Sequence, residues 1–344
     1  DGFTELSTIS GQTLGFRGYI KTGLYSKITA EYHHLQEFRR GGDNLNLPPH
    51  EATIAEQTDH SINPGGLKFD WFSKDQKHRL NVFASAQHIH RESYYGAGQD
   101  PNAYGETLDL TWVAGAQYVY KFDRCIFMPA NFTAGLEYNE DYLRDNMWGY
   151  DRVTSQTVRI ASAYAQNEWK NETWGFLIGG RADKHNLIDH VIFSPRVNFR
   201  YNPNENINIR AVYSSGFRAP QAFDEDLHIL IVGGERTRIR LADDLHEERS
   251  HSFTVSADMY KTWGRVQTNL LVEGFYTRLN GVFTLRDTGE IGNDGARIYE
   301  RYNGSGATVM GLNVEGKIAY APWVEASAGV TLQRSRYKVV EQWS

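Results

Sequence analysis

One long stretch of the chain gathers residue types that bind cations or polar ligands. Within residues 218–247, Asp224, Glu225 and Asp226 are consecutive, and His228 follows two residues after them. Hard cations such as Ca²⁺ prefer clustered carboxylate oxygens. We therefore predict ligand contacts in this stretch. A calcium ion that orders the loop is one alternative, and charges that merely keep a surface loop solvated are the other.

Aromatic and imidazole side chains form two further candidate sites. Tyr94 and Tyr95 open a turn-rich segment and are predicted either to contact ligand or to belong to an aromatic girdle. His88 and His90 share one strand face, because residues two apart in a strand point the same way. This face would suit metal capture. However, it continues through an apolar set, which favours a strand that leaves a lipid band into water: Leu80, Val82, Ala84 and Ala86.

The motifs of common enzymes are absent from the sequence. His50 and Glu51 lack the second histidine of a zinc His-Glu-x-x-His helix, and the Gly233-Gly234 pair is too short for a phosphate-binding loop. No nucleophile elbow accompanies a Ser-His-Asp set. The single cysteine, Cys125, leaves no Cys-x-x-Cys pair. We predict no enzyme, no catalytic residues, no resident metal centre and no cofactor other than the calcium alternative.

Composition narrows the class of protein. The net charge of -6 is spread over interspersed acidic and basic residues, so no basic stripe suits nucleic acid. No apolar run approaches the ~20 residues of a transmembrane helix. The mean hydropathy of -0.55 would suggest a soluble protein, yet transmembrane strands hide from this average because only alternate residues face lipid. The 20 Tyr, 17 Phe and 8 Trp are ample for two interfacial girdles.

Alternation with a period of two runs through the whole chain and predicts an all-β protein of one architectural unit. Its clearest example is residues 191–201, where apolar residues on one face oppose Ser194, Arg196, Asn198 and Arg200 on the other. The pattern predicts 14 strands: 13–22, 26–40, 65–73, 78–91, 107–121, 131–142, 154–169, 174–184, 191–201, 207–217, 248–261, 266–287, 308–320 and 324–340. Nearly all reach the ~9–11 residues that cross a bilayer at a tilt.

The connections between these strands alternate between short and long. Short connections are predicted at 23–25, 74–77, 170–173, 202–206, 262–265 and 321–323. Long ones are predicted at 41–64, 92–106, 218–247 and 288–306, and two segments fit less well: 122–130 and 185–190. In an outer-membrane barrel, short turns lie on the periplasmic side and long loops lie outside. We therefore predict an antiparallel up-and-down transmembrane β-barrel.

The barrel prediction assigns a direction to each strand face. Facing outward should be Phe193, Val197, Phe199, Ile209, Phe253 and Val255. Arg196, Arg200, Arg210 and Ser252 should face the lumen, because a charged side chain at the lipid midplane costs about 2–4 kcal/mol. These arginines either line a ligand path or simply form the polar lumen of a large barrel.

One block of motifs resembles the mid-barrel signature of TonB-dependent receptors. It contains Gly180-Arg181-Ala182-Asp183 after Gly179, then Ser194-Pro195-Arg196, the turn Asn202-Pro203, and Phe217-Arg218-Ala219-Pro220. The preceding Ala165 to Trp169 fits the strand that comes before this block in the family. The acidic and aromatic run from Phe223 to His228 occupies the place of a similar run in such receptors. The resemblance is loose over the whole chain and close over residues 160–260.

The resemblance implies a 22-stranded barrel of which about 14 strands are visible, so that residues 1–344 would be a partial barrel without the family's N-terminal plug domain. It implies a bacterial outer-membrane receptor that actively imports a scarce nutrient complex: an iron-siderophore, haem or cobalamin. Its partners would be that ligand, the TonB complex acting through the plug, outer-membrane lipid and a surface lipoprotein. The rival hypotheses are a passive porin-like channel and a soluble all-β binding protein.

The resemblance also bears on haem. Haem receptors of this family place an axial histidine in the loop after the Phe-Arg-Ala-Pro strand, ahead of an Asn-Pro-x-Leu motif. The matching stretch here, residues 242–247, keeps Leu245 but lacks the Asn-Pro pair. His228 is therefore only a candidate haem ligand.

Overall fold

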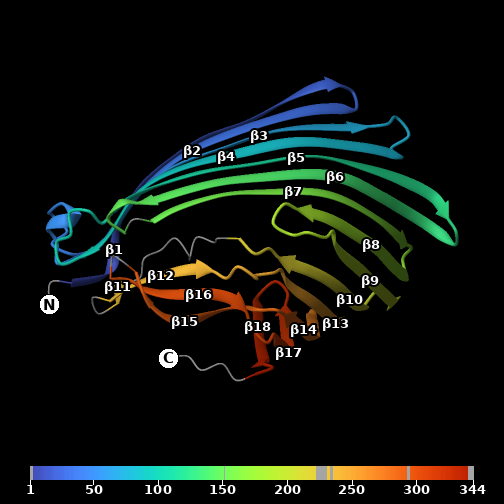
Figure 1. The fold of residues 1–344 in the computed structure, drawn as a ribbon. Coiled ribbons are helices and arrows are strands. Elements are labelled where there is room, and N and C mark those ends of the chain that lie inside the picture. The colour runs from blue at the N-terminus through green and yellow to red at the C-terminus, as the bar shows by residue number, and fades with distance from the viewer. Residues whose placement is uncertain (1–2, 151, 222–230, 233–234, 293–294, 340–344) are drawn as a thin grey trace.

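A single long antiparallel sheet dominates the computed structural model, which describes residues 3–150, 152–221, 231–232, 235–292 and 295–339. Fourteen strands follow one another in the order β1-β2-β3-β4-β5-β6-β7-β8-β9-β10-β13-β14-β17-β18 (Figure 1). Their bounds are β1 Phe3–Gly23, β2 Ser26–Asp43, β3 Ile54–Phe72, β4 His78–Ala97, β5 Tyr104–Cys125, β6 Met128–Met147, β7 Arg152–Lys170, β8 Trp174–His185, β9 Ile192–Asn204, β10 Ile207–Arg218, β13 Glu248–Trp263, β14 Val266–Asn280, β17 Ala307–Tyr320 and β18 Val324–Tyr337. The predicted all-β, up-and-down architecture is confirmed.

The sheet curls but does not close within the described residues, where β1 and β18 are its two edges. Unpaired edges are costly in lipid, because every backbone polar group there needs a partner. The number of strands in a closed barrel, 22 by the resemblance, stays a prediction. The helices among the described residues are two short 3₁₀ helices, η1 at Pro49–Glu51 and η2 at Trp148–Tyr150. Among the described residues, no helix has the length and apolar character to cross a membrane.

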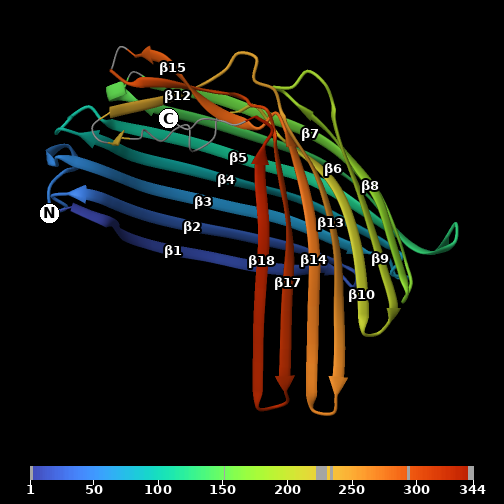
Figure 2. The ribbon, with the colours of Figure 1, turned by 90° about the horizontal axis from the view of Figure 1, so that it is seen from below.

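The connections separate into two ends, as predicted. Tight turns join β7 to β8 at 171–173, β9 to β10 at 205–206 and β13 to β14 at 264–265, while longer segments join strands at the opposite end. Figure 2 shows the turns of β13–β14 and β17–β18 at the far end from the loops. The segment 122–130 fitted the alternation of short and long connections poorly. Most of it is strand, since β5 and β6 meet in a turn at 126–127.

The predicted boundaries of two loops were wrong. The segment 41–64 shrinks to 44–53, and 92–106 shrinks to 98–103, because β3 and β4 extend farther than expected. Part of their extra length is polar, including Asp59 and Glu92. Polar residues on both faces hide the alternation, yet a strand that projects into water above a bilayer needs no apolar face.

The projecting strands make the rim of the sheet uneven. β5 has 22 residues and β6 has 20, whereas β8 has only 12. Trp112 and Tyr138 pack ring to ring 5.1 Å apart on the outer face, and beyond them the same face carries the ion pair of Arg159 and Glu140. The ion pair of Arg159 and Glu140 marks the level at which the outer face becomes polar. Because their strands are longer, β2 to β7 form a tall part of the sheet, called the tall wall here, and β8 to β10 form a lower part.

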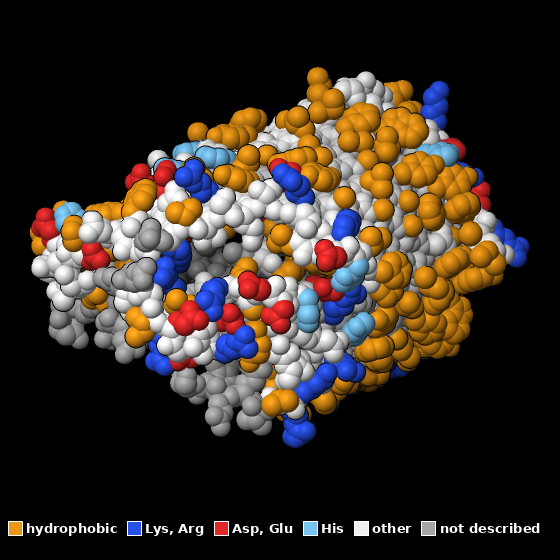
Figure 3. All heavy atoms as spheres, in the orientation of Figure 1, with side chains coloured by type: hydrophobic (Ala, Val, Ile, Leu, Met, Phe, Trp, Pro, Cys, Tyr) orange, Lys and Arg blue, Asp and Glu red, His pale blue; other side chains and the backbone are white. Residues whose placement is uncertain are grey.

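The two faces of the wall differ in chemistry, as the alternation requires. Cross-strand pairing aligns an apolar row on one face: Val82, Ala116, Leu136, Ala163, Ala182 and Phe193. Leu136 is 66% exposed and Phe193 59%, which suits contact with lipid rather than with a protein core. Figure 3 shows apolar side chains gathered over the half of the molecule that carries the short turns. Phe253 and Val255 face the same way, and Ser252 faces the other, as predicted.

A second, smaller sheet was not predicted. It contains β11 Ile231–Val232, β12 Glu235–Leu241, β16 Arg297–Asn303 and β15 Phe283–Ile291, in that order. The predicted strand 266–287 is wrong, because β14 ends at Asn280 and β15 belongs to this second sheet. The segments 218–247 and 288–306 were expected to be loops, yet β12 and β16 within them pair in parallel. Figure 1 shows the small sheet beneath the arch of β2 to β7.

Candidate functional site

The tall wall ends in a buried aromatic cluster at the long-loop end. Tyr94 is 0% exposed, and Tyr95, Met147 and Tyr150 pack with it. The Tyr94 hydroxyl donates to the carbonyl of Asp100 over 2.9 Å. Burial raises the pKa of Tyr94 to about 12, so the phenol stays protonated. A ligand would reach Tyr94 or Tyr95 only after the covering loops moved, and a ligand role for them stays a prediction.

A buried carboxylate lies beside this cluster. Asp145 is 1% exposed, accepts a hydrogen bond of 2.7 Å from the Thr107 hydroxyl, and pairs with Arg152 at 2.7 Å. Arg91 of β4, two strands away in the sheet, lies 3.7 Å from Asp145. Removing one partner of a buried ion pair leaves an uncompensated charge. These contacts therefore connect the ends of the four strands β4 to β7 at the mouth.

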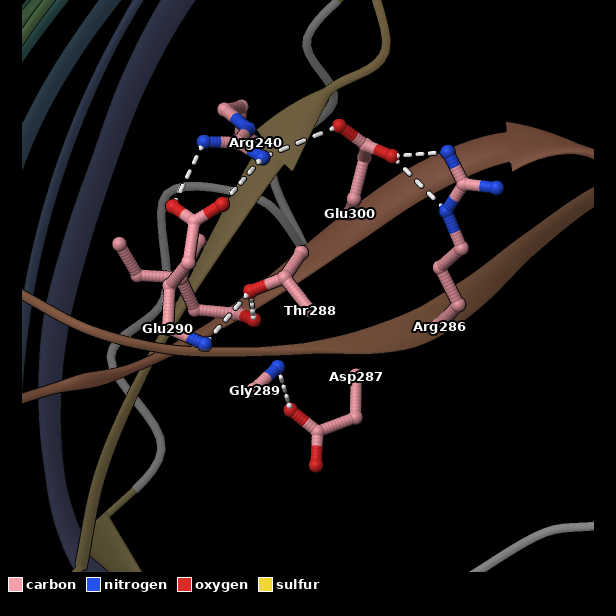
Figure 4. A network of polar contacts seen from close by, with 8 residues as sticks. Arg240, Arg286, Asp287, Thr288, Gly289, Glu290 and Glu300 are labelled. Carbon is pink, nitrogen blue, oxygen red and sulfur yellow. Dashed lines mark hydrogen bonds and ion pairs between the residues drawn. The ribbon is translucent and has the colours of Figure 1, made fainter.

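A network of charged residues ties the small sheet together (Figure 4). Arg240 of β12 reaches Glu290 at 3.0 Å and Glu300 of β16 at 3.2 Å, and Arg286 of β15 also binds Glu300. The hydrogen bond from Arg286 holds the pKa of Glu300 below its ordinary value. Although most of these side chains are exposed, Glu300 is 13% exposed and joins two arginines. The network links segments that are distant in sequence.

Asn303 joins the bases of the two loops. Its side-chain oxygen accepts from the backbone N–H of His246 over 2.8 Å, and its nitrogen donates to the carbonyls of His246 and Gly281 over 2.9 and 2.8 Å. Arg238 of β12 also donates to the carbonyl of Tyr150 at the tall wall over 3.2 Å. The small sheet is thus fastened both at its base and to the rim.

The polar face of the wall carries a neutralised arginine. Arg181 of β8 binds Glu137 at 2.8 Å and Asp183 at 2.7 Å, and it also donates to the Ser162 hydroxyl over 2.7 Å. This residue belongs to the Gly-x-Arg-x-Asp motif singled out in the sequence. Its role visible in the structure is to bridge β6, β7 and β8.

Arg196, Arg200 and Arg210 lie on the face opposite the exposed apolar side chains. Arg210 pairs across strands with Arg200, and Val197 on the other face pairs with Tyr213 and through it with Phe253. No ion pair of these arginines occurs among the described residues. Their lumen-facing role and any part in a ligand path stay predictions at this point.

The acidic segment that contains Asp224, Glu225, Asp226 and His228 lies outside the described residues, as does the pair Gly233-Gly234. A ligand role for this segment is therefore a proposal. Within the part of the chain that the structure describes, no group of three or more His, Cys, Asp or Glu side chains is arranged to hold a metal ion.

The histidines of the two sequence motifs, His90 and His50, each contact a side chain of β5. His90 pairs with Glu106 at 3.0 Å on the same face as Val82, beyond the apolar band. His50 shares a hydrogen bond of 2.8 Å with the Tyr104 hydroxyl. These positions agree with a strand that leaves the lipid band and with a loop residue.

Sequence reasoning missed the residues that organise the mouth, namely Asp145, Arg240, Glu300 and Asn303. A partial signal exists for β12, where Thr237, Ile239 and Leu241 alternate with arginines. That alternation predicts a strand, but it does not indicate which other strand pairs with it. No pattern within a single strand indicates that β12 pairs with β16, because their sequence separation is large and both lie inside expected loops.

Comparison with known proteins fits this geometry. The family model "TonB dependent receptor-like, beta-barrel" matches residues 5–342. The chain therefore belongs to the TonB-dependent receptor-like β-barrel family. Its location is the bacterial outer membrane, which accounts for the exposed apolar face. The family consists of transporters and receptors rather than enzymes. A search of curated proteins finds no match.

Solved structures share the fold at low sequence identity. The siderophore receptor PirA from Pseudomonas aeruginosa aligns with a TM-score of 0.78 at 12% identity, over 96% of this chain and 57% of that one. The alcaligin outer-membrane receptor FauA from Bordetella pertussis gives 0.63 at 13%, over 95% and 54%. The hemophore receptor HasR from Serratia marcescens, solved with its hemophore and heme, gives 0.73 at 14%, over 94% and 54%. The chain spans about half the length of these proteins.

Proposed function

We propose that this protein is an outer-membrane receptor that actively imports a scarce nutrient complex, which it captures at the mouth of the barrel. The family match over residues 5–342 carries this proposal. The ligand would be an iron-siderophore, haem or cobalamin, and similarity to receptors for siderophores and heme supports that choice. Energy would come from the TonB complex acting through a plug domain, in a whole protein of which residues 1–344 form part of the barrel.

The proposed capture site is the loop 218–247, with Asp224, Glu225, Asp226 and His228 as its polar groups. Two observations support it. The loop contributes β12 to a sheet fastened to the rim by Arg238, and three carboxylates and an imidazole fall within five residues. Calcium held by the carboxylates is an alternative role for the same residues.

The test of the site replaces Asp224, Asp226 and His228 with Ala in the full-length protein and measures binding of radiolabelled ferric siderophores, haem and cobalamin to whole cells. We expect at least a tenfold loss of affinity for the one ligand that wild-type cells bind. The matched control is Asp243→Ala with Asp244→Ala, exposed carboxylates of the same loop. Unchanged affinity at normal surface display would refute the binding role.

A requirement for energy distinguishes active import from passive passage through a channel. Cells that express the full-length protein should accumulate the ligand only while TonB is present and the proton gradient is intact, although surface binding persists without either. Accumulation that continues after the gradient is collapsed would favour a porin-like channel instead.

A further inference from the structure

Basic side chains follow the apolar band on the outer face of the last four strands of the sheet. These strands, β13, β14, β17 and β18, lie side by side (Figure 2). Cross-strand pairing forms two successive rows on their outer face. The row nearer the short turns contains Phe253, Tyr276, Met310 and Arg334, and the row nearer the long loops contains His251, Arg278, Thr308 and Arg336. Arginine thus comes directly after the apolar and aromatic side chains of the band.

The outward positions of these four strands carry no carboxylate. They are every second residue of 249–263, 266–280, 308–320 and 324–336, and none of them is Asp or Glu. On the tall wall, by contrast, Glu106 and Glu140 also face outward and pair with His90 and Arg159, each at 3.0 Å. The outer face of β13 to β18 therefore supplies no negative charge of its own to balance its arginines.

The three arginines of the two rows form no ion pair with another described residue. All three are exposed: Arg278, Arg334 and Arg336. Arg278 donates to the neutral side chain of Asn280 over 3.1 Å. Arg249, which lies one row farther toward the long loops, is different, because Glu247 binds it at 3.0 Å. The guanidinium groups of the two rows can therefore bind an anion from outside the chain.

The surface on the short-turn side of the arginines is apolar and open. Leu312 and Leu332 are cross-strand partners there and are 40% and 64% exposed. Gly274 is the other partner of Leu312, and a Cβ at position 274 would meet no atom within 4 Å. Because the long loops of such a barrel lie outside the cell, this surface faces the acyl chains of the outer leaflet. The arginines lie on the headgroup side of it.

The spacing of the arginines suits a headgroup with more than one phosphate. Neighbouring strands lie about 4.8 Å apart, so the backbones of Arg278 and Arg336, two strands apart, are separated by roughly 10 Å. Arg334 lies roughly 7 Å from Arg336 along β18. Thr308, which stands between Arg278 and Arg336, adds a hydroxyl donor. Three guanidinium groups over this area exceed what a single phosphate can contact.

We propose that Arg278, Arg334 and Arg336 bind the phosphorylated headgroup of a lipid of the outer leaflet, whose acyl chains lie against Leu312 and Leu332. Guanidinium groups bind phosphate oxygens through paired hydrogen bonds, and basic residues at a membrane surface attract anionic lipids. Because arginines supply all of the positive charge and no carboxylate stands beside them, a divalent cation is not needed to hold the phosphates. The site is independent of the ligand that the receptor imports.

The direct test is native mass spectrometry of the full-length protein in a mild detergent, with diphosphorylated lipid A as the probe. We expect wild type to retain the lipid, and to retain it equally in EDTA. Arg278→Gln with Arg336→Gln should weaken binding by about tenfold or more, whereas the matching Arg→Lys pair, which keeps the charge, should weaken it only a few-fold. The control Arg144→Gln with Arg159→Gln removes two outward charges from β6 and β7 of the tall wall and should leave binding unchanged.

Two further measurements distinguish a lipid site from a site for free phosphate. Lipid A without phosphates should bind equally weakly to wild type and to the double Gln variant, because the arginines have nothing to contact. Pyrophosphate in excess should leave the phosphorylated lipid bound, because it lacks the acyl chains that lie against Leu312 and Leu332. Displacement of the lipid by pyrophosphate would show a simple anion site and would overturn the lipid assignment.

Three results of the direct test would also overturn the site. The first is a wild-type protein that retains no phosphorylated lipid, as expected if acidic residues elsewhere in the full-length protein already cover the arginines. The second is loss of the lipid in EDTA, which would mean that a divalent cation rather than arginine holds the phosphates. The third is equal retention by a folded double Gln variant, with folding judged by heat-modified electrophoretic mobility.

Discussion

The long wall and the small loop sheet are held together by different forces. Within the wall, neighbouring strands in sequence are neighbours in space, and backbone ladders continue from β1 to β18, interrupted in the strand numbering only where β11–β12 and β15–β16 belong to the small sheet. In the small sheet, β12 and β16 come from different loops and pair in parallel, and the ion pair of Arg240 with Glu300 joins them. Local pattern therefore determines the wall, and side-chain chemistry between distant segments determines the loop sheet.

The largest effect should come from the aromatic cluster where the wall meets its loops. Tyr94→Ala removes a fully buried ring, and deletions of this size cost about 3–5 kcal/mol. We expect loops 44–53 and 98–103 to become sensitive to protease on whole cells while the wall stays folded. Tyr94→Phe, which loses only the hydrogen bond to Asp100, is the control. A variant as resistant as wild type would mean that the cluster does not organise the mouth.

A charge on the outer face should cost somewhat less and should affect the wall alone. Val255 is 57% exposed in the apolar band of β13, and Val255→Arg should lower the stability by about 2–4 kcal/mol. Thr254→Arg, one residue earlier on the polar face, is the matched control. Unfolding in urea, followed by electrophoretic mobility in lipid vesicles, measures both. Equal losses for the two variants would break the contrast between the faces.

The base of the loop sheet should respond more weakly. Asn303→Ala removes three hydrogen bonds, each worth about 0.5–1.5 kcal/mol. Amide exchange should accelerate in β12 and β16 but not in β13 or β14. Asn313→Ala, which removes one bond to Glu273 within the wall, provides the comparison. Slower or unchanged exchange in β12 would show that the two loops are joined by other contacts.

The smallest effect should be a loss of stability of the small sheet at acidic pH. Hydrogen bonds from Arg286 lower the pKa of Glu300, and those from Arg297 lower the pKa of Asp287, relative to ordinary values of 4.5 and 3.8. Because both pKa values are depressed in the folded state, the stabilisation is complete above these values and is lost as the pH falls through the lower folded ones. Protease cleavage within 283–303 should therefore rise only at acidic pH. Glu300→Gln should remove part of this dependence, and a cleavage rate independent of pH would contradict it.

Much of the wall could be predicted from the sequence, because lipid on one face and a polar interior on the other impose a period of two. Strands such as 191–201 therefore emerged with their faces assigned. The projecting ends of β3 and β4 were missed, since residues such as Asp59 and Glu92 face water and carry no apolar signal. The pairing of β12 with β16 could not be predicted, because it depends on contacts such as Arg240 with Glu300 between segments about 60 residues apart.

The residues of the candidate site also fall into two groups, those that the sequence indicates and those that only the structure reveals. The alternation of polar and apolar residues placed Arg196, Arg200 and Arg210 on the polar face, and the cross-strand pairing agrees with that placement. Buried Asp145 and the clamp of Asn303 carry no sequence signature, since an isolated Asp or Asn in a strand end indicates nothing about its partners. The functional residues of the loops can therefore be identified from side-chain contacts in the structure but not from the periodicity of the sequence.

The central claim is that this sheet is a membrane wall with one lipid-facing side, and labelling along β13 tests it most directly. Each residue from Ser250 to Tyr260 is replaced in turn by Cys in a full-length protein whose Cys125 is changed to Ala, and spin labels are attached in outer-membrane vesicles. Labels at 253, 255 and 257 should collide with oxygen dissolved in lipid, whereas labels at 252, 254 and 256 should collide with a water-soluble nickel reagent. Equal accessibility to water at both sets of positions would contradict it.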